Sequence, residues 1–227
     1  MAIILNLETA TTNCSVSIAK NGKVIAIKEH DTPNYSHSEQ LHVFIQEVVQ
    51  NASLTLNDID AVAVSKGPGS YTGLRIGVSS AKGLCFALEV PLISIATLTS
   101  LAHQKNANTC EYIIPLLDAR RMEVYSAVFN TNQEEIRETK AEIIDANSFS
   151  DFAELGTVLL LGSGAKKCQD ILVHPNFNFD IEAIPSANEM SNLSYNKFLK
   201  QDFEDLAYFE PFYLKDFIMQ KKKKVAK

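Results

Sequence analysis

The chain has 227 residues, of which 46% are hydrophobic and 21% charged, and 21 Lys and Arg against 27 Asp and Glu give a net charge of −6. This length and composition indicate a globular protein of one or two domains with a sizeable core. No apolar run approaches the roughly 20 residues of a membrane helix, and the N-terminus lacks the basic start and long apolar stretch of a signal peptide, so we expect a soluble, cytoplasmic protein.

The first third of the chain predicts an antiparallel meander of three strands. Residues 2–7 form a continuous apolar run, which is typical of a strand buried on both faces. Residues 14–19 alternate between apolar residues and serines, and Asn21 with Gly22 then supplies a two-residue turn. The apolar residues that follow, up to residue 27, predict the third strand.

Two helices and two further strands are predicted next. Ser36 and Glu39 have the spacing of a capping box, and the apolar residues after them recur at helical spacing: Leu41, Phe44, Ile45, Val48 and Val49. Residues 60–65 and 91–96 predict short core strands, separated by a helix over 72–88 that Ser70 or Thr72 can cap. A meander that continues into crossover units predicts a mixed sheet covered by helices.

A similar order restarts after about residue 110. Its apolar or alternating runs predict strands over 112–117, 123–129, 135–144 and 158–161, with a helix starting near Asn147. This spacing suggests a duplicated unit, and the polar stretch 104–108 marks the boundary. We therefore divide the chain into an N-terminal subdomain (1–105), a C-terminal subdomain (106–220) and a basic tail (221–227).

The tail changes the charge balance. It reads Lys-Lys-Lys-Lys-Val-Ala-Lys, and without it 16 basic residues face 27 acidic ones, a charge of −11. Such an acidic body is not typical of a protein that holds a polyanion over a broad surface. The tail is either a solvated end or a flexible arm that attracts RNA, and the sequence leaves both interpretations open.

The most unusual segment is 65–83, which predicts a strand end, a tight Gly-Pro-Gly turn and the start of a helix. Free N–H groups at a helix start attract anions, and Lys66 and Arg75 lie close by in the sequence. The segment does not match a P-loop, because no Gly-Lys-Ser/Thr follows at the required spacing. A phosphate contact is therefore only a weak prediction here.

The helix that follows carries small residues along one face: Gly73, Gly77, Ser80 and Ala81. A glycine inside a helix costs about 1 kcal/mol relative to alanine, and the usual reason for it is close approach of another backbone. That backbone belongs either to the same domain or to a partner subunit. Because a second face of the helix is also apolar, the pattern favours the partner subunit.

Residues 66–83 closely resemble the signature of the bacterial TsaB (YeaZ) family. Residues 5–18, 37–39, 115–125 and 211–216 resemble further segments of that family, so that the resemblance spans almost the whole chain. It implies an α/β protein of the actin-like, Hsp70-like ATPase fold (RNase H-like), with two subdomains that each contain a mixed sheet and flanking helices.

The resemblance also implies a function. The family supplies a non-catalytic subunit that pairs with its larger paralogue TsaD, is joined by the ATPase TsaE, and supports threonylcarbamoylation of the tRNA adenosine next to the anticodon. It implies no cofactor for this chain, room for ATP at the level of the complex, indirect tRNA contact and a homodimer when the chain is alone. The residues that match the pairing elements are Ser36, His37, Leu41, Tyr71, Gly73, Leu74, Arg75, Gly77, Val78, Ser80 and Ala81.

The alternative is a stand-alone ATPase or small-molecule kinase. Glu8 and Asp118 stand where active members of the superfamily carry carboxylates, and Gly162–Gly164 resembles a degenerate nucleotide loop. The weak candidates for phosphate contact are Glu8, Thr9, Thr11, Lys66, Gly69 and Asp118. We favour the simpler interpretation, a strand-end residue and a turn, because an isolated Gly-x-Gly has little specificity.

Metal and nucleophile chemistry are not predicted. TsaD-like proteins bind iron through His-x-x-x-His, whereas His37 and His42 are five residues apart and lie on different sides of a helix. The four cysteines are widely spaced, with no Cys-x-x-Cys, and are expected to be free thiols. No Ser or Cys has a His partner that the sequence can place beside it. We expect neither a metal site nor a catalytic residue.

Overall fold

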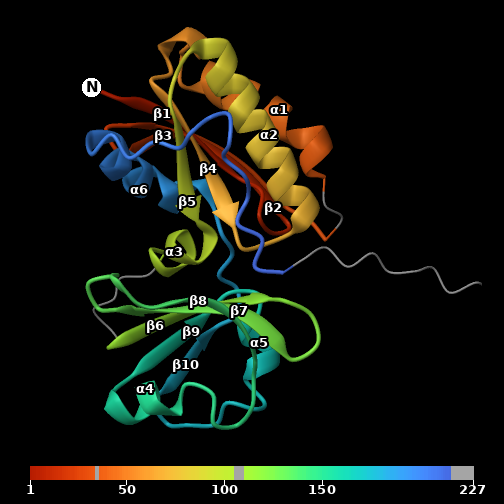
Figure 1. Cartoon of the computed structure of the whole chain (residues 1–227), viewed down its shortest axis with the longest axis vertical. Coiled ribbons are helices and arrows are strands. Elements are labelled where there is room, and N and C mark those ends of the chain that lie inside the picture. The colour runs from red at the N-terminus through yellow and green to blue at the C-terminus, as the bar shows by residue number, and fades with distance from the viewer. Residues whose placement is uncertain (34–35, 105–109, 216–227) are drawn as a thin grey trace, which may run out of the picture.

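The computed structural model describes residues 1–33, 36–104 and 110–215, which form two lobes, each built on a five-stranded mixed sheet (Figure 1). The strand order is β3-β2-β1-β4-β5 in the first lobe and β10-β9-β6-β7-β8 in the second. Taken from β8 to β10, the second order repeats the first: a three-stranded meander is followed by two crossover strands. The predicted duplication is therefore visible as topology.

The first sheet contains the predicted meander. Asn21 and Gly22 both have positive φ at its first turn, as such turns require. The last two strands run parallel to the first. The strands are β1 (Ile3–Glu8), β2 (Asn13–Lys20), β3 (Lys23–Asp31), β4 (Ala61–Gly67) and β5 (Leu92–Ala96).

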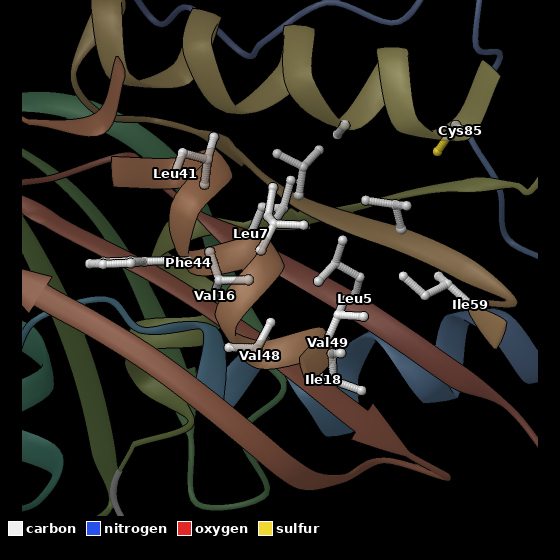
Figure 2. Close-up of a cluster of buried hydrophobic side chains, with 14 of the residues drawn as sticks. Leu5, Leu7, Val16, Ile18, Leu41, Phe44, Val48, Val49, Ile59 and Cys85 are labelled. Carbon is white, nitrogen blue, oxygen red and sulfur yellow. The ribbon is translucent and has the colours of Figure 1, made fainter. Parts of the chain in front are cut away.

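One side of this sheet is covered by α1 (His37–Asn51) and α2 (Tyr71–Leu88), with the short 3₁₀ helix η1 (Leu56–Asp58) between them in the chain. The predicted apolar stripe of α1 is buried in full. In Figure 2, strand side chains such as Leu7 and Val16 lie against Phe44 of α1, and Cys85 extends from α2. This side of the sheet is an apolar core, as the helical spacing predicts.

The opposite side of the first sheet is covered by α6 (Ala187–Leu199), which follows the second sheet in the chain. Ala187 and Met190 of this helix belong to an apolar cluster with residues such as Ile4 and Ile93, and hydrogen bonds add to the contact. Ser17 Oγ donates to the carbonyl of Ala187 at 2.8 Å, Ser15 Oγ accepts from the Ala187 N–H at 3.0 Å, and Ser194 Oγ donates to Asn6 Oδ1 at 2.7 Å. The division at residue 105 stays a prediction, and α6 shows that a C-terminal segment packs on the first lobe.

The second sheet has helices on both faces. Residues of α3 (Thr97–Ala102) pack on one face, and residues of α4 (Ser150–Leu155) and α5 (Ala165–Cys168) pack on the other. The sequence predicted four of its strands, while α3, α5 and β10 were not predicted. The strands are β6 (Tyr112–Asp118), β7 (Glu123–Asn130), β8 (Glu135–Ile143), β9 (Val158–Leu161) and β10 (Phe177–Asp180).

The starts of α1 and α2 differ from each other. Of the two predicted caps of α2, Ser70 and Thr72, the structure shows Ser70 in this role, because its Oγ accepts from the Gly73 N–H at 3.3 Å. The capping box predicted for Ser36 and Glu39 is wrong. Ser36 has φ −108° and ψ 17° rather than an extended conformation, and its hydroxyl caps no N–H of α1. Only the backbone carbonyl of Ser36 serves this helix start, accepting from the Glu39 N–H at 3.0 Å.

Three further predictions concern the cysteines, membrane-spanning helices and the basic tail. The four cysteines, all within the described residues, are free thiols, as predicted. None of the helices in the described parts of the chain is long and apolar enough to cross a membrane. The basic tail 221–227 lies outside the described residues, so its prediction stays open.

Candidate functional site

The loop after β1 packs tightly against the start of α2. A Cβ atom added to Gly73 would lie 2.1 Å from the Thr9 carbonyl oxygen, and one added to Gly77 would lie 2.2 Å from Thr9 Oγ1. Thr9 is fully buried and its Oγ1 donates to the Gly73 carbonyl at 2.8 Å. The close approach that these two glycines require is therefore made within the chain.

Much of the predicted pairing set lies inside the first lobe rather than on its surface. His37 is buried, with its Nε2 2.8 Å from the carbonyl oxygen of Thr11. The other buried members are Leu41, Gly73, Leu74, Gly77, Val78 and Ala81. These side chains hold α1 and α2 on the sheet, and they are not available to a partner while the helices stay packed.

A different set of residues forms the exposed surface of the two helices. Ser80 Oγ lies 3.2 Å from His42 Nε2 and links α2 to α1. On the solvent side, Val43 is 50% exposed and Phe86 is 81% exposed. A Cβ on Gly83 would meet nothing within 4 Å. We call the exposed residues His42, Val43, Gln46, Arg75, Ser79, Gly83 and Phe86 the α1–α2 surface.

Arg75 and Tyr71 are the two predicted pairing residues that remain accessible near the start of α2. The Arg75 guanidinium carbon lies 4.4 Å from the centre of the Tyr71 ring, a cation–π arrangement. Sequence reasoning missed Val43, Gly83 and Phe86, although residues 75, 79, 83 and 86 follow helical spacing. That spacing places the four residues on one face of the helix, but it does not show whether this face meets the sheet or solvent.

Glu8 ends β1 in a closed environment. Its side chain is fully buried, and Oε1 accepts a hydrogen bond of 2.6 Å from the Ala10 N–H. Burial is the largest influence on this carboxyl and raises its pKa to about 7, although hydrogen bonds from Ala10 and Ser65 act in the opposite direction. Glu8 therefore does not present a carboxylate to solvent at the end of the strand.

Asp118 ends β6 in the second lobe and is held by contacts within the chain. It forms a salt bridge with Lys167, and its Oδ1 also accepts from the Arg120 N–H at 2.8 Å. The loop Gly162–Gly164 folds back on β6, since the Gly164 N–H donates to the Leu116 carbonyl at 2.9 Å. Gly162 has φ +107°, and a Cβ there would lie 2.5 Å from the Leu116 carbonyl oxygen. Glycines at positions 162 and 164 therefore allow this loop to turn closely against β6.

The remaining phosphate candidates have structural contacts as well. Thr11 Oγ1 accepts from the Asn13 N–H at 3.4 Å, and a Cβ on Gly69 would lie 2.4 Å from the Ala10 carbonyl oxygen. The carbonyl of Lys66 accepts from the Phe212 N–H at 2.7 Å. Thr11 thus closes the loop after β1 locally, Gly69 brings the turn after β4 against that loop, and Lys66 joins the end of β4 to the C-terminal segment.

Two cavities lie outside the Glu8 and Asp118 positions. One, of about 510 Å³, is lined by Ile27, Glu29, Gln104, Asp180, Glu182, Ala183, Ile184, Ser186, Asn188 and Glu189. The other, of about 440 Å³, is lined by Lys66, Glu204, Asp205, Tyr208, Phe209, Glu210, Pro211 and Phe212. Of the six phosphate candidates, only Lys66 lines either cavity.

Nucleophile and metal chemistry find little support in the described geometry. Burial raises the pKa of the Cys14 thiol to about 11 and that of Cys85 to about 12, which keeps both protonated near neutral pH. In residues 1–33, 36–104 and 110–215, no group of three or more His, Cys, Asp and Glu side chains could hold a metal ion.

Comparison with protein families gives one match over most of the chain. Residues 32–223 match the model of the TsaD family, described as tRNA N6-adenosine threonylcarbamoyltransferase. Among curated relatives, the tRNA threonylcarbamoyladenosine biosynthesis protein TsaB of Escherichia coli K12 is 29% identical over 96% of this chain and 97% of the relative. TsaB of Haemophilus influenzae is 37% identical over 54% of this chain and 51% of the relative.

Solved structures of similar proteins match the fold. YeaZ from Pseudomonas aeruginosa superposes with a TM-score of 0.78 at 22% identity, covering 94% of this chain and all of that one. A second structure, described as similar to peptidase YEAZ from the same bacterium, gives 0.84 at 24% identity and covers 95% of this chain and all of that one. The predicted fold class, two mixed sheets with flanking helices in the actin-like arrangement, is confirmed.

Proposed function

The chain belongs to the tRNA N6-adenosine threonylcarbamoyltransferase family and, within it, to the TsaB (YeaZ) group, and on this premise we propose that it is a non-catalytic subunit in threonylcarbamoyladenosine (t6A) biosynthesis. Its partner is the larger paralogue TsaD, which performs the transfer to the N6 of adenosine. TsaE joins the pair, tRNA is contacted through the complex, and ATP belongs to the assembly rather than to this chain.

The open space beside Gly83 is the observation that carries the proposal. Gly73 and Gly77 face Thr9, but Gly83, in the same helix, has open space where a side chain would stand. A helix-interior glycine costs about 1 kcal/mol unless something uses the space. Its neighbour Phe86 is 81% exposed, which is unusual for so large an apolar side chain. A backbone that approaches Gly83 and covers Phe86 would account for both residues.

The same surface serves two assemblies in this proposal. A paralogue with the same fold carries a helix pair at the corresponding place, so helices can pack on helices in a heterodimer with TsaD. In the absence of TsaD, two copies of the chain can pair through this surface about a two-fold axis, with each residue contacting its equivalent region in the other copy. We therefore propose a homodimer for the isolated chain.

The alternative, a stand-alone ATPase or kinase, draws less support from the geometry. It requires Glu8 to organise a metal and a phosphate, yet Glu8 is fully buried and its raised pKa favours the neutral form up to about pH 7. Asp118 is already paired with Lys167. The purified chain should show no ATP turnover with Mg²⁺. Turnover that Glu8→Gln abolishes would favour the alternative.

Gly83→Arg is expected to weaken binding to TsaD at least about 100-fold while the chain folds normally. The new side chain has room in the free protein, but it would block close approach and place an unpaired charge in the contact, which costs several kcal/mol. Titration calorimetry measures the affinity. Glu154→Arg, at an exposed position of α4 in the second lobe, is the matched control and should bind as the wild type does. Equal binding by Gly83→Arg would contradict the proposed surface.

A further inference from the structure

The C-terminal segment 200–215, which we call the strap, runs from the end of α6 back across the first lobe toward the second (Figure 1). Its backbone is fixed at several points. The Glu204 N–H donates to the Leu92 carbonyl at 2.9 Å, and the Phe212 N–H donates to the Lys66 carbonyl at 2.7 Å. At its end, Lys215 forms a salt bridge with Glu123 of the second lobe. The strap is therefore a well-anchored element although it is neither helix nor strand.

The strap also packs directly on α2. Lys82 of that helix donates from Nζ to the carbonyls of Ala207, at 3.1 Å, and Phe209, at 3.0 Å. Tyr213 lies against Tyr71, with ring centres 4.7 Å apart. Arg75 of the α1–α2 surface stands over the same Tyr71 ring. The α1–α2 surface and the strap thus adjoin each other along α2.

Two aromatic side chains of this anchored strap face solvent. Tyr208 is 84% exposed and Phe212 is 44% exposed. Both line the cavity of about 440 Å³, together with Phe209 and Pro211. Exposed aromatic residues on a fixed backbone, grouped around a hollow, are typical of a protein–protein contact, because they bury large area at small entropic cost.

The cavity also has a charge preference. Glu204, Asp205 and Glu210 line it, against one basic residue, Lys66. Asp205 Oδ1 already accepts from the Ala207 and Tyr208 N–H groups, and Glu204 accepts from Ser94, so these two carboxylates are fixed in place. Glu210 lies exposed beside them. An occupant that combines an apolar anchor with a Lys or Arg side chain complements this lining.

From this arrangement, we propose that the strap cavity is a second contact site for the protein that pairs through the α1–α2 surface, and that it takes an apolar and basic segment of that protein. The inference rests on the proposed pairing with TsaD and extends it to a place that neither Gly83 nor Phe86 reaches. A partner lying along α2 meets the strap at Tyr71, Arg75 and Lys82, so the two contacts are continuous.

The test measures the affinity of the full-length chain for TsaD by titration calorimetry. The double variant Tyr208→Ser/Phe212→Ser is expected to bind about tenfold more weakly, as expected for the loss of aromatic contacts. Glu210→Lys is expected to bind about fivefold more weakly, mainly at low salt. The controls are Leu155→Ser and Glu154→Lys on exposed positions of α4. All variants should stay folded. We expect wild-type melting temperatures for Glu210→Lys and the two controls, and a small decrease for the double variant because Phe212 is only 44% exposed.

Three outcomes overturn the inference, and they differ in what else they overturn. If the wild-type chain does not bind TsaD, the proposed function falls with it. If Gly83→Arg loses binding while the strap variants bind like the controls, only the strap contact is wrong. If the chain shortened to residues 1–215 binds TsaD more tightly than the full-length chain, and the strap variants are unaffected, the tail rather than TsaD occupies the cavity.

Discussion

Gly77→Ala is expected to lower the free energy of unfolding by about 2–3 kcal/mol, whereas Gly83→Ala in the same helix raises it by up to about 1 kcal/mol. The helix-propensity gain of alanine over glycine is the same at both positions. The difference lies in the surroundings. The new Cβ at residue 77 would stand 2.2 Å from Thr9 Oγ1, while at residue 83 nothing lies within 4 Å.

Thr9 cannot move away from a Cβ at residue 77 without losing a hydrogen bond. Its Oγ1 is buried and donates to the carbonyl of Gly73 at 2.8 Å, so rotating the side chain breaks a buried hydrogen bond. Overpacking by itself typically costs about 1–3 kcal/mol. Urea unfolding of the two variants, followed by circular dichroism, measures both changes. If both variants gain stability, the contact between α2 and the loop after β1 is not as close as described.

Glu8→Gln is expected to stabilise the protein at pH 8 by roughly 3 kcal/mol and to change little at pH 4. The pKa of Glu8 rises from 4.5 to about 7 on folding, so between these values the folded state holds a proton that the unfolded state has released. The stability that this group contributes is therefore fully present below about pH 4.5 and is lost as the pH rises through about 7. Glutamine keeps the shape and carries no charge that burial would penalise.

The measurement is the free energy of unfolding of the wild type and of the variant between pH 4 and pH 9. The difference between them should grow with pH and level off above about pH 8, following the pKa shift of this single group. Glu154→Gln, at an exposed position on α4, supplies the control and should track the wild type. Parallel profiles for the wild type and Glu8→Gln would show that Glu8 stays ionised and solvated in the folded chain.

The sequence predicted the elements whose hydrophobic period is strong. The meander of the first lobe and the helices α1 and α2 follow directly from residues such as Leu7, Val16 and Leu41. The strand over residues 14–19 shows where the pattern misleads. Ser15 and Ser17 suggest a solvent-facing side, yet both are buried beneath α6. A polar strand face met by a polar helix face leaves no apolar signal.

The same reason explains why α6 was not predicted. Its buried stripe consists of Ala187, Met190, Ser191 and Ser194, which is too small and too polar to stand out in the sequence. The helix is held by an apolar cluster around Met190, to which the sheet contributes, and by hydrogen bonds to the sheet, including the one from Ser194 to Asn6. Only the tertiary structure brings these partners, which are far apart in the chain, into contact.

The predicted pairing residues stay a prediction, and the structure shows which of them are buried within the first lobe and which are accessible. The glycines of α2 required a close neighbour, and the sequence could not say whether that neighbour belonged to the same chain. In the structure, Thr9 is the close neighbour of Gly73 and Gly77, whereas no atom lies within 4 Å of a Cβ placed on Gly83. Phe86 was missed because helical spacing does not show which apolar face meets the sheet and which meets solvent.

The most direct test of the central proposal is reconstitution of the tRNA modification. Purified TsaD and TsaE, tRNA, ATP and a threonylcarbamoyl donor are combined with the wild-type chain, with Gly83→Arg, or with neither, and modified adenosine is measured by mass spectrometry. We expect modification with the wild-type chain, and a loss of at least about 100-fold both with Gly83→Arg and without the chain. Equal modification in the absence of the chain, or with Gly83→Arg, would contradict the assignment of this protein as the pairing subunit.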